Sequence, residues 1–283
     1  MTLANEEQAA YWSQVAPKWL ELDDQLALEV LGALPARLAM DRLNVSAGQR
    51  ILDIGCGTGR TTLELAGLVG PAGAVVGVDI SAALLASGRA EAARLGIDNA
   101  EFVHGDVQVS DLGESLFDAA YSRFGVMFFA DPSAAFAHVR DALRPGAVLS
   151  FACWGPVLDN DWAVVPIAAA AQITGSLPPM PGPGEPGSFS LADPGRIREI
   201  LSKAGFGHIE VTPHADQIAI SEAGITSFAG VALELLRFAG ALTDADEEMR
   251  AQALGAIEQG LRARLQAGQV LLSRSSHLVT ARS

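Results

Sequence analysis

The sequence predicts an α/β fold, a doubly wound and mostly parallel sheet of seven strands with helical lid insertions. Two observations predict it. Short apolar runs alternate with helical stretches from residue 50 onward, and a glycine-rich turn follows the first run. Because these runs are nearly continuous in apolar residues, they are typical of parallel strands that are covered on both faces. With 283 residues and 49% hydrophobic content, the chain can bury a large core.

The elements follow from local patterns along the chain. Apolar residues three and four apart predict helices over the first 45 residues, and five strands with intervening helices come next. A helix over Pro194–Ala204, a strand, two helices within residues 222–265 and a last strand complete the fold. The predicted strands are Arg50–Ile54, Ala74–Asp79, Ala100–His104, Phe117–Ser122, Ala147–Trp154, Gly207–Pro213 and Gln269–Ala281.

Polar residues mark the starts of several helices. Ser81 precedes one helix, while Asp131 and Asp193 each stand before a proline, which places a capping side chain ahead of proline at the first helical position. Thr243 followed by Asp246 resembles a capping box that opens the second helix of residues 222–265. These signals support the alternation of strands and helices.

The same pattern gives the organisation of the chain. Residues 1–45 form an N-terminal helical cover, and residues 46–154 form the core of the sheet, which contains the glycine-rich turn. Residues 155–190 are a Pro/Gly-rich insertion with a loop at Leu177–Gly187. Residues 191–283 complete the sheet and carry a helical lid at 222–265. We therefore expect one sheet with covers rather than two independent domains.

Charge and cysteine content exclude several functions. The chain has 19 basic and 33 acidic residues, a net charge of −14, so we expect no nucleic-acid or membrane-surface partner. The start of the chain lacks a leader pattern, and no apolar stretch reaches the roughly 20 residues that span a bilayer. Two cysteines without a CxxC pair predict neither a disulfide framework nor a thiolate zinc site. The sequence predicts a cytoplasmic protein.

The strongest chemical signal is the segment ILDIGCGTGR, residues 51–60. A strand runs into Gly55, Gly57 and Gly59, and glycines at such a turn let a ligand approach the backbone closely. A dinucleotide fingerprint would have its third glycine at position 60, where this chain has Arg60. This spacing disfavours a nicotinamide-dependent oxidoreductase, which stays an alternative.

Two acids follow the next two strands. Asp79 ends the second strand about 20 residues after the glycine turn, where a carboxylate can accept hydrogen bonds from two ribose hydroxyls. Asp106 follows the third strand and could accept a hydrogen bond from an exocyclic amine. Because the carboxyl ends of parallel strands meet at one edge, these residues and the glycine turn should share one crevice.

The ordered motifs DIGCGTG, VVGVDIS, GDVQ, FDAAYSRFGVMFFADP and LRPGAVLSFACW resemble those of class I S-adenosylmethionine-dependent methyltransferases. The resemblance covers residues 10–154 and is closest to the small-molecule group of methyltransferase type 11/25, which is similar to quinone-biosynthesis methyltransferases. It implies a Rossmann-like fold and S-adenosyl-L-methionine as cofactor, with S-adenosyl-L-homocysteine as product. It also implies in-line methyl transfer to an O, N or C atom of a small organic molecule. A catalytically silent cofactor-binding subunit stays the other alternative.

The resemblance also implies roles for individual residues. The methionine part of the cofactor would lie on Gly55, Cys56, Gly57 and Gly59, with Asp53 holding the loop and the α-amino group. Asp79 would bind the ribose, Ile80 and Val107 would pack on the adenine, and Asp106 would bind its amine. Ser122 and Arg123 would lie beside the reactive methyl group, and Tyr11 and Trp19 would close over the cofactor.

The acceptor site is less legible than the cofactor site. Arg123 is a cation within an apolar run and could pair with an acceptor carboxylate or oxyanion, or with a neighbouring acid. Phe128, Trp154 and Trp162 are candidate walls for an apolar or aromatic acceptor. No catalytic base is assigned and no metal is expected. The apolar segment Val231–Phe238 could serve either a lid or a homodimer.

Overall fold

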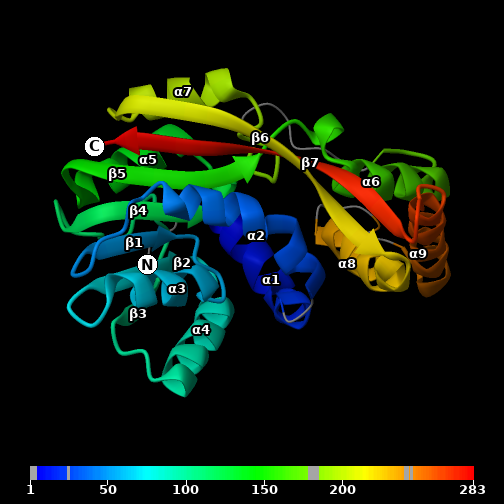
Figure 1. The fold of residues 1–283 in the computed structure, drawn as a ribbon, viewed down its shortest axis with the longest axis horizontal. Helices are drawn as coiled ribbons and strands as arrows, with labels where there is room; N and C mark the ends of the chain where they lie inside the picture. Colours follow the sequence, from blue (N-terminus) through cyan, green and yellow to red (C-terminus); the bar gives the residue numbers. More distant parts are fainter. Residues whose placement is uncertain (1–4, 24–25, 178–184, 239–241, 243–244) are drawn as a thin grey trace.

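The computed structural model describes residues 5–23, 26–177, 185–238, 242 and 245–283. These residues form an α/β fold around one seven-stranded sheet, as the sequence predicted (Figure 1). The strand order is β3-β2-β1-β4-β5-β7-β6, and β1 to β5 are parallel. β7 runs antiparallel to both of its neighbours. The strands are β1 (Arg50–Ile54), β2 (Ala74–Asp79), β3 (Ala100–His104), β4 (Phe117–Arg123), β5 (Leu143–Trp154), β6 (Gly207–Ser221) and β7 (Gln269–Arg282).

Alternate residues of the central strands face two different apolar layers. Ile51 of β1 is buried with Met40 of α2 (Leu26–Asp41) and Leu65 of α3 (Arg60–Val69). Its neighbour Leu52 is buried in the larger cluster on the other face, together with Phe136 of α5 (Pro132–Ala142). α7 (Pro194–Lys203) packs against α5 and β6. Helices thus cover both faces of the sheet.

The chain reverses its direction of winding at β1. β2 and β3 extend the sheet on one side of β1, and β4 and β5 extend it on the other. In open α/β sheets, ligands bind at the carboxyl ends of the strands where such a reversal opens a crevice. The loops after β1 and β4 meet there, because Gly55 and Gly125 lie backbone to backbone.

Several predicted helix starts are confirmed, and one is corrected. Ser81, Asp131 and Asp193 are the N-caps of α4 (Ala82–Leu95), α5 and α7. In α9 (Glu247–Arg262) the cap is Asp246, whose carboxylate accepts from the Met249 N–H at 2.8 Å. The predicted capping box made Thr243 the cap instead, and Thr243 lies outside the described residues.

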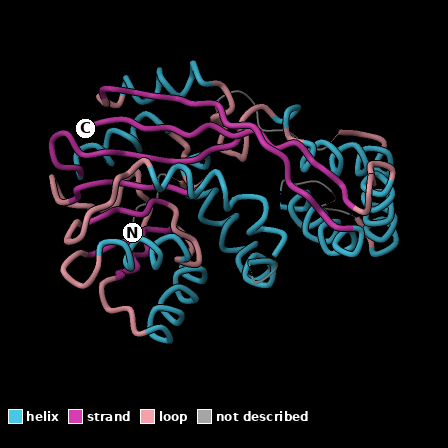
Figure 2. The backbone as a smooth tube through the Cα atoms, in the orientation of Figure 1, coloured by secondary structure: helices cyan, strands magenta, loops and turns pink. Residues whose placement is uncertain are grey.

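The last two strands reach beyond the sheet. β6 and β7 continue as a long hairpin toward α6 (Asp161–Thr174), α8 (Ile225–Phe238) and α9, which pack together beside the sheet (Figures 1 and 2). The pattern predicted neither α6 nor the extension of β6 from Pro213 to Ser221. In the described part of the chain, one-turn helices lie between β4 and α5 (Val126–Phe128), between β5 and α6 (Val157–Asp159) and between β6 and α8 (Glu222–Gly224).

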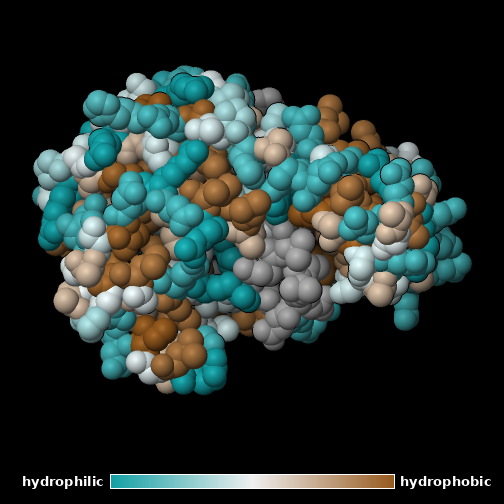
Figure 3. Space-filling view, viewed as in Figure 1, coloured by the Kyte–Doolittle hydropathy of each residue, from teal (hydrophilic) through white to brown (hydrophobic). Residues whose placement is uncertain are grey.

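The N-terminal helix α1 (Glu6–Asp23) packs on two other helices. α1 contacts α2 and α4. Hydrophilic residues spread over much of the face in Figure 3, with hydrophobic patches between them. Among the described helices, none is both long enough and apolar enough to cross a bilayer.

Candidate active site

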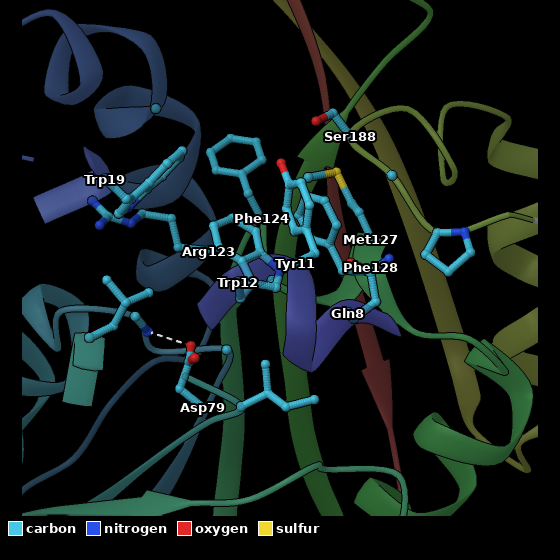
Figure 4. A pocket seen from close by; sticks show the side chains of 18 of the residues that line it. Gln8, Tyr11, Trp12, Trp19, Asp79, Arg123, Phe124, Met127, Phe128 and Ser188 are labelled. Carbon is cyan, nitrogen blue, oxygen red and sulfur yellow. Dashed lines mark hydrogen bonds between the residues drawn. The ribbon is translucent and has the colours of Figure 1, made fainter. Parts of the chain in front are cut away.

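A cavity of about 460 Å³ lies where the carboxyl ends of β1, β2, β4 and β5 meet α1, α6 and α8. One side of it is formed by the glycine loop after β1 and by the residues that follow β2 and β3. The other side is formed largely by aromatic rings, several of which surround the same space in Figure 4. The cavity therefore joins a polar backbone loop to an aromatic chamber.

The glycine loop is held open toward the cavity by its backbone. The N–H groups of Gly55 and Cys56 both donate to the carbonyl of Val78 on β2, at 2.9 and 3.2 Å. Gly55 and Gly57 have positive φ angles of 63° and 57°, a conformation that glycine adopts without strain. No atom lies within 4 Å of the place where a Cβ on Gly57 would stand. A ligand can therefore contact this backbone directly.

Asp79 links the loop to the end of β2. Its carboxylate accepts from the Gly57 N–H and from the Ser81 N–H, each at 2.8 Å, and the first of these bonds is drawn in Figure 4. Burial raises the pKa of this carboxyl above its ordinary value, and the two N–H groups oppose the rise. Each carboxylate oxygen has two lone pairs, so Asp79 can accept further hydrogen bonds from a ligand in the cavity.

Asp53 stands behind the loop rather than in the cavity. One of its oxygens accepts from the hydroxyls of Thr61 and Thr62, both at 2.7 Å, and thereby fixes the start of α3. The other oxygen, Oδ1, is buried without a partner among the described residues. Burial raises the pKa of Asp53 to about 6, although the threonine hydroxyls and the charge of Arg123 oppose this rise.

Asp106 is bound by the residue that precedes α1. Its carboxylate accepts from the backbone N–H of Asn5 at 3.0 Å and from the Asn5 side-chain amide at 3.4 Å. The amide oxygen of Asn5 accepts in turn from the Ala130 N–H at 2.7 Å. Asn5 is only 6% exposed. It thus ties the start of α1 to the loops that follow β3 and β4.

Aromatic residues of α1 form one wall of the chamber. Trp12 packs edge to face with Tyr11, Trp19 and Phe128, with ring centroids 5.2 to 5.4 Å apart. Burial raises the pKa of Tyr11 to about 12. The phenol is therefore protonated at neutral pH, where it can donate a hydrogen bond but cannot act as a base.

A second aromatic wall faces the chamber from the sheet and α6. Phe124 stacks on Trp154 with centroids 4.2 Å apart, Trp154 lies 4.8 Å from Trp162, and Trp162 lies 6.0 Å from Phe189. The indole N–H of Trp162 donates to the buried Asn160 Oδ1 at 2.7 Å. These four rings form a continuous apolar surface from the end of β4 to residue 189.

The ionisable groups around the cavity leave little scope for a base. All five histidines lie in the described part of the chain, and none of them lines the cavity. Burial raises the pKa of the Cys56 thiol well above its ordinary value, which keeps it protonated and unreactive. Arg123 lines the cavity as a cation beside Phe124. The described residues also contain no group of three His, Cys, Asp or Glu placed to hold a metal ion.

The structure brings most of the residues singled out in the sequence to one cavity. Those that line it are Tyr11, Trp19, Gly55, Cys56, Gly57, Asp79, Ile80, Asp106, Val107, Arg123, Phe128, Trp154 and Trp162.

Asp53, Gly59 and Ser122 do not line the cavity. Gly59 closes against Phe102 on the far side of the loop. Ser122 is buried and donates to the Ile54 carbonyl at 2.8 Å. These residues shape the loops from behind.

Sequence reasoning missed several residues of the cavity. Trp12 stands seven residues before Trp19, and this helical spacing could have placed both on one face. Asn5, Gly32, Phe124 and Phe189 carry no local signal, because distant contacts bring them to the site. The apolar segment at 231–238 supplies Ala232, Leu235 and Leu236. Val231, Leu233 and Leu236 are buried within the chain, which favours a lid over a dimer surface for this segment.

Comparisons with known proteins show which family and fold the chain is similar to. A family model described as a methyltransferase domain matches residues 51–146. The ubiquinone/menaquinone biosynthesis C-methyltransferase UbiE of Hahella chejuensis is 34% identical over 142 residues, which cover 50% of this chain and 57% of that protein. The O-methyltransferase cnsE of Penicillium expansum is 30% identical over 202 residues, which cover 71% of this chain and 67% of that protein.

A solved structure shows the same fold. The YcgJ protein of Bacillus subtilis matches with a TM-score of 0.57 at 15% identity, over 88% of this chain and 97% of that one. For the two curated relatives, in contrast, the chain spans 57% and 67% of their length.

Proposed function

Because the chain belongs to the class I S-adenosylmethionine-dependent methyltransferases, we propose that it methylates a small, apolar and aromatic acceptor at an O, N or C atom. One observation carries the proposal. A single cavity joins the open glycine loop, where this family binds its cofactor, to a chamber walled by aromatic rings. Apolar pockets with few polar groups are typical of sites for small organic molecules.

The residues around the glycine loop fit the cofactor. The space beside Gly57 is open, and the Asp79 carboxylate stands at its edge with lone pairs to spare. In our proposal Gly55, Cys56 and Gly57 lie along the methionine part, and Asp79 accepts from the ribose hydroxyls. Ile80 packs on the adenine with Val107 nearby, and Asp106 accepts a hydrogen bond from the adenine amine. Tyr11 and Trp19 close over the bound cofactor.

Three further residues act from behind the loop in this proposal. Asp53 fixes the start of α3 and thereby holds the loop on which the α-amino group lies, so it acts on that group through the loop rather than by direct contact. Gly59 allows the loop to close against Phe102. Ser122 holds the end of β4 next to β1.

When bound, the cofactor supplies a methyl group attached to a positively charged sulfur. The sulfur is the leaving group and becomes a neutral thioether, so the methyl group needs no further activation. The chain's task is therefore to orient the acceptor and to exclude water. The two aromatic walls do both. Phe128, Trp154 and Trp162 contact the acceptor in our proposal, and Arg123 stabilises its negative charge. No residue is assigned as a base, because Tyr11 and Cys56 keep their protons at neutral pH.

The remaining assignments follow from the whole chain. A net charge of −14 favours a small molecule over nucleic acid or a membrane surface as partner, and we propose a cytoplasmic protein. A homodimer would need a surface other than 231–238, since Val231, Leu233 and Leu236 are buried in the chain. We also propose residues 46–154 as the cofactor-binding core, with an N-terminal helical cover at 1–45 and a Pro/Gly-rich insertion at 155–190. Residues 191–283 complete the sheet and carry the helical lid at 222–265.

Calorimetry with S-adenosylmethionine, S-adenosylhomocysteine and NADH tests the proposal. We expect both adenosyl compounds to bind and NADH not to bind. Asp79→Ala should weaken the binding of S-adenosylhomocysteine by about 1–3 kcal/mol, because it leaves hydrogen-bonding groups unpaired. Binding of NADH alone would contradict the proposal, and an unchanged affinity in the variant would contradict the ribose role of Asp79. Methyl transfer from labelled cofactor to aromatic acceptors separates an enzyme from a silent cofactor-binding subunit.

A further inference from the structure

Phe124 has an unusual backbone. It follows Arg123 at the tip of β4, and its φ angle is +59°. Bulky side chains rarely adopt this left-handed conformation, which is strained and persists where surrounding contacts enforce it. Such residues cluster at ligand sites, so the contacts around Phe124 indicate what the conformation achieves.

The turn that carries Phe124 is fixed relative to the glycine loop. The Phe124 N–H donates to the Ala152 carbonyl at 3.1 Å. The Ser122 hydroxyl donates to the Ile54 carbonyl at 2.8 Å and accepts from the Gly125 N–H at 3.2 Å. A Cβ on Gly55 would stand 2.9 Å from the Gly125 Cα, so the two loops touch through their backbones.

The ring of Phe124 is confined on two sides. It stacks on Trp154 with a centroid distance of 4.2 Å and an interplanar angle of 17°. A Cβ on Gly32 of α2 would stand 3.2 Å from the ring atom Cε2, so the ring lies close to the α2 backbone and a side chain at position 32 would press on it. The ring lines the cavity next to Arg123 (Figure 4). It is thus the end of the aromatic wall that is anchored to the glycine loop.

We propose that Phe124 determines how large an aromatic acceptor can approach the methyl donor. This inference rests on the proposed function for its acceptor class. Trp154 on one side and the α2 backbone at Gly32 on the other limit how far the ring can withdraw, and close-packed protein interiors do not absorb an additional ring. An acceptor with one fused ring more than the space beside Phe124 can hold must therefore bind farther from the glycine loop or not bind at all.

Two substitutions change the position of this boundary in opposite directions. Phe124→Gly removes the ring and keeps the positive φ without strain, so it enlarges the chamber. Gly32→Ala adds a methyl group behind the ring and pushes it into the chamber, while alanine favours the helix. The second variant keeps the test decisive if the first one folds poorly.

The measurement is calorimetric titration of protein saturated with S-adenosylhomocysteine, with 2-naphthol and 9-phenanthrol as two-ring and three-ring probes. Phe124→Gly should raise the affinity for the three-ring probe relative to the two-ring probe by about tenfold or more, which is about 1.4 kcal/mol. Gly32→Ala should lower the same ratio. As a control on the opposite wall, Phe128→Ala should weaken both probes and leave the ratio within about twofold.

Several outcomes would overturn the assignment. Equal changes for both probes, or changes in the same direction in the two variants, would mean that Phe124 does not set acceptor size. Failure of both probes to bind the parent protein would refute the aromatic acceptor site. The affinity for S-adenosylhomocysteine, measured in a separate titration of the ligand-free protein, separates these results from a failure of the proposed function, because absence of binding to the parent protein would show that the cofactor assignment itself is wrong.

Discussion

At the scale of single residues, the two acids near the glycine loop do different work. Asp79 lines the cavity and holds the loop through the Gly57 N–H. Asp53 is fully buried and accepts from two threonine hydroxyls that open α3. A buried carboxylate with one unpartnered oxygen is costly in its charged form. This cost makes Asp53 a source of pH-dependent stability in the ligand-free protein.

The sign of that dependence follows from the pKa of Asp53, which burial raises from 3.8 to about 6. The folded protein then holds this proton more tightly than the unfolded chain does, so the stabilisation is complete below about pH 4 and is lost as the pH rises through 6. Asp53→Asn keeps an oxygen for both threonine hydroxyls and removes the charge. We expect the free energy of unfolding of the variant, relative to the parent, to rise by on the order of 3 kcal/mol between pH 4 and pH 7.

Urea unfolding at several pH values measures this difference. Glu101→Gln is a matched control, because it removes one negative charge from an exposed position on β3. Its unfolding free energy should follow that of the parent at every pH within about 0.5 kcal/mol. A constant difference between Asp53→Asn and the parent would show that the carboxyl titrates normally in the folded protein.

At the scale of elements, the position of α6 depends on one side chain. The Asn160 amide donates to the Pro156 carbonyl at 2.9 Å, and its oxygen accepts from Trp162 Nε1 at 2.7 Å and from the Ser275 N–H at 2.9 Å. Asn160 is fully buried. It therefore joins the start of α6 to β7 and orients one ring of the acceptor wall.

Asn160→Ala leaves an indole N–H and a backbone N–H without their acceptor in the interior. We expect it to lower the free energy of unfolding by about 2–4 kcal/mol, since each such group costs about 1–3 kcal/mol. Denaturant unfolding followed by tryptophan fluorescence measures the change. The neighbouring Asp159→Ala, at an exposed position, should change it by less than about 0.5 kcal/mol. Equal effects in the two variants would remove Asn160 from this role.

How much of the fold could be predicted depends on whether the signals are local. Apolar runs and capping residues placed β1, β2 and β3 at their observed bounds. The prediction ended β6 at Pro213, yet the strand continues to Ser221, and its Asp216 is matched across the hairpin by Arg274, whose Nε donates to it at 2.7 Å. That pair is close in space and distant in sequence, so no local pattern could reveal it.

The same distinction applies to the site. The glycine loop, Asp79 and Asp106 were found because the chemistry requires those residue types at strand ends. Phe124 was missed because its importance lies in a positive φ angle and in contacts with Trp154 and Gly32. A phenylalanine in an apolar run is indistinguishable from core without that geometry.

At the scale of the whole molecule, the first 45 residues divide into two parts with different roles. α1 supplies Tyr11, Trp12 and Trp19 to the cavity and reaches Asp106 through Asn5. α2 instead belongs to the layer that covers the sheet. Its Ala36 and Ala39 carbonyls accept from the buried hydroxyls of Tyr121 and Ser150, at 2.8 and 2.7 Å. α1 closes the site, whereas α2 mainly completes the core and meets the cavity at Gly32.

Truncation should separate these roles. Removing residues 1–23 should leave cooperative thermal unfolding intact and weaken the binding of S-adenosylhomocysteine by about tenfold or more. The reason is that α1 covers the cavity, whereas α2 is the helix that packs against the sheet. Removing residues 1–45 should abolish cooperative unfolding. That deletion exposes the apolar surface under Met40 and Leu43. It also leaves the buried hydroxyls of Tyr121 and Ser150 without hydrogen-bond acceptors. Near-ultraviolet circular dichroism on heating, with calorimetry at 25 °C, measures both properties. If the shorter deletion also abolished the transition, α1 would be part of the folding core, and its aromatic wall would not be a separable cover.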